Sequence, residues 1–152
     1  MLIPDKITVA KSDRLAWVDG RLHEGWAAQL PFVDADDLRI ARTQYMHGSH
    51  YSEWVCARAI WSRFGFFSLL EKYEFATHPQ KAVVLKRLGV KIERNPNCQH
   101  PDLLVYRPNY SEWGFVEVKT KRDKLSVRQL RHFPEIERQH GRKIKILQLV
   151  EV

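Results

Sequence analysis

The chain has 152 residues, of which 44% are hydrophobic and 28% are charged, a composition typical of one soluble globular domain. No run of about 18 apolar residues could span a membrane, and the first residues lack the pattern of a signal peptide. We therefore expect a cytoplasmic protein. The formal net charge of +7 favours a polyanionic partner such as nucleic acid.

The first 46 residues show weak periodicity, and we expect them to form an N-terminal extension of unknown role, separate from or part of the domain at 47–152. ITVA (7–10) is typical of a strand, and RLHEGWAAQL (21–30) of a short helix ended by Pro31. Trp17 and Trp26 could cover the core or a dimer partner as readily as a ligand.

The pattern becomes stronger after residue 47. Gly48 and Ser49 indicate a turn, and Ser52 is expected to cap a helix that runs to Phe64 before Gly65. A second helix is predicted over HPQKAVVLKRLG (78–89), with Pro79 near its start and Gly89 at its end.

Three strands are then predicted over VKIER (90–94), DLLVY (102–106) and GFVEVKT (114–120), with RPNYSEW as the turn between the last two. A helix capped by Ser126 follows, interrupted by Pro134 and ended by Gly141, and KIKILQLVEV closes the chain as a strand. This order predicts an α/β or α+β fold, with a mixed β-sheet flanked by helices.

Charged residues interrupt these apolar strands at three positions. Side chains two apart on a strand share a face, so Glu117 and Lys119 point together, while the turn can return Asp102 to the vicinity of Glu117. Two adjacent carboxylates favour a hard divalent cation, and a lysine beside them can hold a water and balance charge on a phosphate. The pattern indicates metal-dependent phosphodiester cleavage. The alternative is a surface ion pair of Glu117 with Lys119, with Asp102 belonging to a turn.

PDLLVY followed by GFVEVKTKRDKLSVRQ resembles the PD-(D/E)XK nuclease superfamily, and within it the VRR-NUC family. The resemblance is sharp over residues 98–129 and implies a restriction-endonuclease-like core with Mg²⁺- or Mn²⁺-dependent deoxyribonuclease activity. It also implies a homodimer that cuts branched or four-way junction DNA in recombination or repair. Small stand-alone proteins of this kind are often carried by phages, which would place the enzyme in the host cytoplasm.

By this resemblance Asp102, Glu117 and the carbonyl of Val118 would bind the metal, and Lys119 would position the attacking water. A further glutamate is implied on the preceding helix. Glu53 shares an apolar helix stripe, although it could equally be a first-turn acid that favours the helix dipole, and Glu71 and Glu74 are rival positions.

Gln129 matches a glutamine of the family's site, and it also completes a capping box with Ser126. Both roles can coexist.

Basic residues cluster after the proposed site and could follow a phosphate backbone, or form a solvated helix face. They are Lys121, Arg122, Lys124, Arg128 and Arg131, with His132 beside them.

Cysteines and histidines form no recognisable ligand pattern. Cys56 and Cys98 belong to no C-x-x-C pair, so neither a disulfide framework nor a structural zinc site is predicted. The spacings of His47 with His50 and of Cys98 with His100 suit no zinc set, and surface or capping roles are expected.

The alternatives to a junction nuclease are a sequence-specific restriction-type nuclease and a non-catalytic DNA-binding module with a nuclease fold. The RPNYSEW turn could also wedge into a distorted DNA junction.

Overall fold

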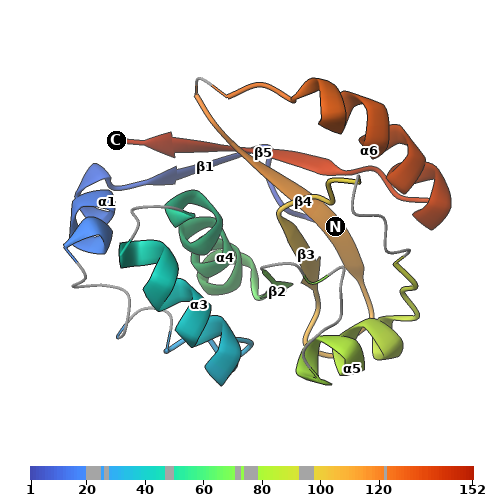
Figure 1. Ribbon diagram of the computed structural model, residues 1–152, viewed down its shortest axis with the longest axis horizontal. Helices are drawn as coiled ribbons and strands as arrows, with labels where there is room; N and C mark the ends of the chain where they lie inside the picture. The colour runs from blue at the N-terminus through green and yellow to red at the C-terminus, as the bar shows by residue number, and fades with distance from the viewer. Residues whose placement is uncertain are drawn as a thin grey trace.

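A five-stranded mixed β-sheet forms the centre of the computed structural model, and helices pack on both of its faces (Figure 1). The structure describes residues 1–19, 25, 28–46, 50–70, 73, 79–92, 98–121 and 123–152. The strand order is β1-β5-β4-β3-β2, in which β5 runs parallel to β1 and β4, and β3 runs antiparallel to β4 and β2. The predicted fold class is confirmed.

The strands are β1 (Lys6–Val9), β2 (Phe67–Leu69), β3 (Leu103–Tyr106), β4 (Trp113–Thr120) and β5 (Lys145–Glu151). The helices are α1 (Lys11–Val18), α3 (Ala35–Met46), α4 (Tyr51–Phe64), α5 (Pro79–Leu88) and α6 (Val127–His140). No helix in the described ranges is long and apolar enough to cross a membrane.

Alternation along β3 divides the core between the two faces of the sheet. Leu103 and Val105 point to one side and join a cluster that includes Trp54 and Ile60 of α4. Leu104 points to the other side and joins a cluster with Phe133 of α6. Both sides of β3 are therefore buried, which explains its unbroken apolar sequence.

The connection from β4 to β5 positions α6 on the second face. Its first turn is closed by a capping box, in which Ser126 Oγ accepts from Gln129 N and the Gln129 side chain accepts from Ser126 N. The helix continues through Pro134 and ends at His140, where Gly141 takes a positive φ of 62°. The predicted bounds of this helix are confirmed.

Two predicted features differ from the structure. Ser52 is not the N-cap of α4, because the helix already begins at Tyr51 and His50, with φ of 62°, stands at the cap. Burial of Tyr51 against the core determines this start. Residues 90–92 form no strand, since Val90 and Ile92 use their apolar side chains to pack on the α6-side cluster rather than to extend the sheet.

Three elements were not predicted, namely α1, α3 and β2. Most of the helix proposed over 21–30, including Trp26, lies outside the described residues, and so does the turn at Gly48 and Ser49.

The N-terminal segment contributes directly to the core. Its strand β1 pairs with β5 at one edge of the sheet, as Ile7 faces Leu149. Trp17 on α1 has no exposed surface and stacks on Trp54 of α4, with ring centroids 6.3 Å apart. Of the roles considered for Trp17, the structure shows the core one.

We predict that Trp17→Ala lowers the free energy of unfolding by about 3–5 kcal/mol, because a large buried ring is lost and a cavity remains. Urea denaturation followed by far-UV circular dichroism measures the change. Leu15→Ala on the same helix is the matched control, since Leu15 is 66% exposed. A loss below about 1 kcal/mol for Trp17→Ala would contradict this role of α1.

Candidate active site

The antiparallel register of β3 and β4 places Asp102 opposite Glu117. Leu103 pairs with Val116, so the residue before Leu103 lies across from the residue after Val116. Asp102 is half-buried and Glu117 is 2% exposed. The structure thus brings together the two carboxylates that the sequence pattern singled out.

Two hydrogen bonds hold these carboxylates in place. Asp102 N donates to Glu117 Oε2 at 3.1 Å, and Val118 N donates to Asp102 Oδ2 at 2.9 Å. Each strand therefore fixes the acid of its neighbour through a backbone N–H, at the point where β3 begins. Hydrogen bonds from backbone amides to carboxylates are charge-assisted and fix the carboxyl groups in orientation.

Lys119 and Gln129 complete the polar cluster. Lys119 Nζ lies 2.9 Å from Glu117 Oε1 and 3.0 Å from Gln129 Oε1. Gln129 Nε2 also donates to Glu117 Oε1. The same Gln129 oxygen accepts from Ser126 N, so one amide serves both the cap of α6 and the carboxylate cluster. Gln129 therefore caps α6 and contacts Glu117 and Lys119 at the same time.

Burial and mutual repulsion disfavour two negative charges at this site. Burial and, after it, the negative charges of Glu117 and Glu53 raise the pKa of Asp102 to about 8, against the hydrogen bond from Val118 and the charge of Lys119. A carboxyl group with such a pKa is protonated at neutral pH unless another positive charge joins it. The electrostatics therefore favour a cation beside Asp102.

Glu53 lies in the first turn of α4 and is half-buried. Its charge contributes to the raised pKa of Asp102, and also, after burial, to the raised pKa of the Cys56 thiol. The helix α4 thus brings this glutamate towards the carboxylate pair. The rival positions Glu71 and Glu74 lie outside the described residues.

The donor chemistry of the site fits a hard divalent cation. Asp102 and Glu117 offer carboxylate oxygens, which Mg²⁺ and Mn²⁺ prefer, and Mg²⁺ in proteins retains several waters. Among the described residues no cluster of three or more His, Cys, Asp or Glu side chains is placed to share one ion. The fit is to a two-carboxylate site completed by further oxygen ligands, with Val118 fixed beside it by its N–H to Asp102.

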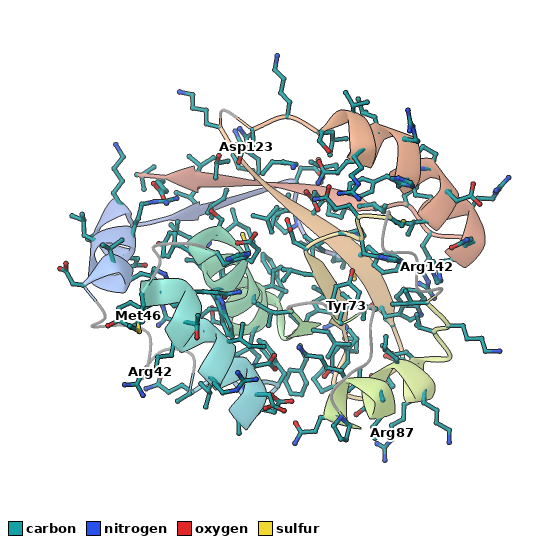
Figure 2. All side chains as sticks on the ribbon, viewed as in Figure 1. Arg42, Met46, Tyr73, Arg87, Asp123 and Arg142 are labelled. Carbon is teal, nitrogen blue, oxygen red and sulfur yellow. The ribbon has the colours of Figure 1, made fainter. Side chains whose placement is uncertain are left out.

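A tight turn carries the chain from β4 towards α6. Asp123 Oδ2 accepts from Thr120 Oγ1 at 2.6 Å and from Thr120 N, and Asp123 N donates back to Thr120 O at 3.0 Å. Figure 2 shows Asp123 at the tip of this loop. The exposed basic residues around it and on α6 are Lys121, Lys124, Arg128 and Arg131, while Arg122 lies outside the described residues.

His100 departs from the surface or capping role expected of it. Its side chain is half-buried, Nδ1 has no hydrogen-bond partner among the described residues, and burial together with His140 and His132 lowers its pKa to about 4. His140 packs edge-on against Phe115, with centroids 5.2 Å apart. Only tertiary packing creates this environment, so no local signal in the sequence identifies it.

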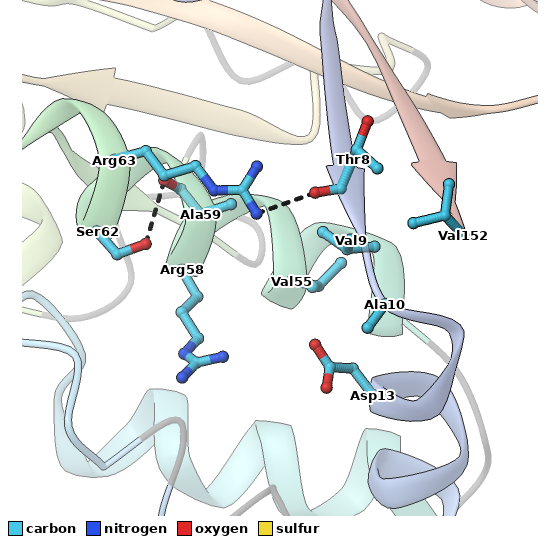
Figure 3. A pocket seen from close by; sticks show the side chains of 10 residues that line it. All are labelled: Thr8, Val9, Ala10, Asp13, Val55, Arg58, Ala59, Ser62, Arg63 and Val152. Carbon is cyan, nitrogen blue, oxygen red and sulfur yellow. Dashed lines mark hydrogen bonds between the residues drawn. The ribbon is translucent and has the colours of Figure 1, made fainter.

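A cavity of about 330 Å³ lies away from the carboxylates, where β1, α1 and α4 meet (Figure 3). Arg63 Nη2 donates to Thr8 O across it at 2.9 Å, and Arg58 and Asp13 extend into it. None of the residues of the carboxylate cluster lines this cavity.

A protein of known structure has a fold similar to this one. No family model matches the chain, and no curated protein matches it. The fold is similar to part of paFAN1 in its crystal structure bound to 2-nt 5′ flap DNA with a gap, at 19% identity and a TM-score of 0.33. The match covers 91% of this chain and 29% of that one. Values this low establish neither a family nor an activity for the chain.

We predict that Asp102 contributes to the free energy of unfolding of the metal-free protein, and that this contribution falls as pH rises from about 4 to about 8. The folded state retains this proton and the unfolded state releases it, so deprotonation favours unfolding. Thermal unfolding at several pH values measures this contribution as the difference in melting temperature between the wild type and Asp102→Asn. The lowered pKa values of His100 and His140 make stability rise with pH, and this opposite effect is the same in both proteins.

At pH 8, addition of Mg²⁺ should raise the melting temperature of the wild type by several degrees and leave Asp102→Asn unchanged. Parallel pH profiles for the two proteins would contradict this description of the site.

Proposed function

We propose that the chain is a metal-dependent deoxyribonuclease that hydrolyses phosphodiester bonds at the Asp102, Glu117 and Lys119 cluster. The observation that carries the proposal is the pairing of two hydrogen-bonded carboxylates, one buried and one half-buried, with a lysine ammonium 2.9 Å from the buried one. A surface ion pair would be solvent-exposed, whereas Glu117 is 2% exposed.

Each residue of the cluster has a distinct role in this proposal. Asp102, Glu117 and the Val118 carbonyl would hold Mg²⁺ or Mn²⁺, which when bound polarises a phosphate and lowers the pKa of a water. Lys119 Nζ can donate to a water or a phosphate oxygen and neutralise developing negative charge. Gln129 orients Lys119, since its Oε1 accepts from Nζ. Glu53 adds negative charge on the α4 side.

The substrate in this proposal is DNA, and more narrowly branched or four-way junction DNA cut by a homodimer. A net charge of +7 and the exposed basic residues of the β4–α6 loop support a polyanion. A junction presents two symmetric strands, which a two-fold enzyme can match. Resolution of recombining DNA, including phage DNA, is the process that suits this activity.

Cleavage assays test the activity directly. Junction, flap, duplex and single-stranded DNA are incubated with the protein in Mg²⁺ or Mn²⁺, and we expect Asp102→Ala, Glu117→Ala and Lys119→Ala each to lower the rate at least about 100-fold. Lys143→Ala is the matched control, since Lys143 is 93% exposed and lies outside the cluster.

Absence of cleavage on every substrate, or wild-type rates in Asp102→Ala or Lys119→Ala, would refute the activity. Discrete fragments from plasmid DNA would indicate a restriction-type enzyme instead. Metal-independent binding that survives Asp102→Ala, without cleavage by the wild type, would indicate a non-catalytic module.

If the β4–α6 loop contacts phosphates, the affinity for DNA depends on salt concentration. Lys124→Ala should weaken binding of all DNA sequences alike and reduce the slope of log K against log salt by about 1. Fluorescence anisotropy in Ca²⁺ at several salt concentrations measures the slope. Lys91→Ala, an exposed lysine distant in sequence from the loop, serves as the control. An unchanged slope for Lys124→Ala would exclude Lys124 from the DNA contact.

A further inference from the structure

A second cavity, of about 210 Å³, lies at the opposite end of β3 from Asp102. It is smaller than the roughly 300–1,000 Å³ of pockets that take drug-sized ligands, so its occupant is a single small group. Residues from the start of α3, from α5, from β2 and β3 and from the β3–β4 turn line it, and the six used below are Phe32, Asp37, Phe67, Lys81, Tyr106 and Tyr110.

Aromatic rings form the walls of this cavity. Phe67 lies 5.5 Å from Phe32 and 5.8 Å from Tyr106, and Tyr106 stacks on Tyr110 at 5.8 Å with an interplanar angle of 17°. Tyr110 takes a positive φ of 62°, an unusual conformation for a tyrosine, and its N–H donates to Arg107 O at 2.8 Å. The turn therefore holds this ring at the cavity despite the backbone cost.

Polar groups line the cavity among these rings. Lys81 Nζ lies 2.8 Å from Asp37 Oδ1, and the two side chains are 2% and 4% exposed. Tyr106 is 4% exposed and also lines the cavity. Burial, the neighbouring Tyr110 and the charge of Asp37 raise the pKa of Tyr106, which keeps the hydroxyl protonated as a donor.

A tyrosine hydroxyl can donate one hydrogen bond to a ligand. Flat rings beside a donor and an ion pair match a planar, aromatic and edge-polar group. A nucleobase has this combination, and every base offers a π-face for stacking and a polar edge for hydrogen bonds. A purely apolar side chain would make no use of these polar groups.

The position of the cavity also suits a nucleic acid held at the carboxylate cluster. Residues 102, 104 and 106 share one face of β3, so Asp102 and Tyr106 are separated by roughly 13 Å at 3.3 Å per residue. This equals about four steps of a nucleic-acid strand at 3.4 Å per nucleotide. Arg87 lies beside Tyr110, with its guanidinium 5.2 Å from the ring, where a cation can meet the backbone phosphate.

We propose that this cavity binds one unpaired nucleobase of a DNA substrate, against the aromatic rings and with the Tyr106 hydroxyl as a donor to its edge. The inference rests on the proposed DNA-directed function and deepens it, because it assigns a preference for DNA with an unpaired nucleotide a few positions from the cut.

Binding to DNA that carries single abasic sites tests this inference. A flap substrate is prepared as a series in which one unpaired nucleotide at a time lacks its base, and affinity is measured by anisotropy in Ca²⁺ without cleavage. For the wild type we expect one position, about four steps from the phosphate that is cut in Mg²⁺, at which loss of the base weakens binding about tenfold.

Variants assign the effect to the cavity. Tyr110→Asn removes the ring while retaining a residue that tolerates positive φ, and should bind intact DNA about tenfold more weakly with no further loss for the abasic strand. Tyr106→Phe removes only the hydroxyl and should give a smaller loss at the same position. Arg42→Ala is the control, since Arg42 is exposed on α3 and does not line the cavity (Figure 2).

Equal affinities across the abasic series for the wild type would overturn the proposal, as would failure to bind DNA at all. Equal weakening of intact and abasic DNA by Tyr110→Asn would do the same. A base-dependent affinity in a protein that never cuts DNA would instead refute hydrolysis and leave the nucleobase site supported.

Discussion

The reciprocal fixing of Asp102 and Glu117 across the β3–β4 ladder is the constraint on which the rest of the site depends. At the point where β3 begins, the backbone N–H groups of Asp102 and Val118 donate to side-chain carboxylates. A shift of one residue in this register would turn the alternating side chains to the other face and separate the two acids. The burial of both faces of β3 prevents such a shift, so the hydrophobic core on either side holds the geometry of the polar cluster.

The electrostatic cost of this arrangement is distributed over several elements. Lys119 offsets part of the repulsion between the carboxylates, and Gln129 donates to one of them from α6. These contacts do not offset the burial and repulsion completely, and the pKa of Asp102 is therefore raised. A site with this uncompensated negative charge responds to cations, because an added positive charge offsets the repulsion between the carboxylates and the cost of their desolvation. The loop residues Lys121 and Lys124 are exposed and lie outside this cluster.

The sequence predicts the half of the fold in which local pattern and burial agree. The β3, β4, α6 and β5 segments show apolar runs, a capping box and clear turn residues, and Asp102, Glu117 and Lys119 could be located from them. The helix α3 was missed because two of its inward positions are polar: Asp37 pairs with Lys81, and Gln44 accepts from Trp54 Nε1 at 2.8 Å. Their partners are distant in sequence, so hydrophobic periodicity cannot reveal them. The short strand β2 and the uncapped helix α1 give similarly weak local signals.

The order in which contacts can form differs between the site and the sheet that supports it. The carboxylates, the lysine and the glutamine all lie within residues 102–129, so their contacts close short loops at low entropic cost. The pairing of β1 with β5, by contrast, joins Ile7 to Leu149 across nearly the whole chain. During synthesis the hairpin and the cap of α6 have their partners available before β5 exists. The edge strand β1 cannot pair until β5 has been made, and until then its apolar side chains Ile7 and Val9 stay exposed to other chains.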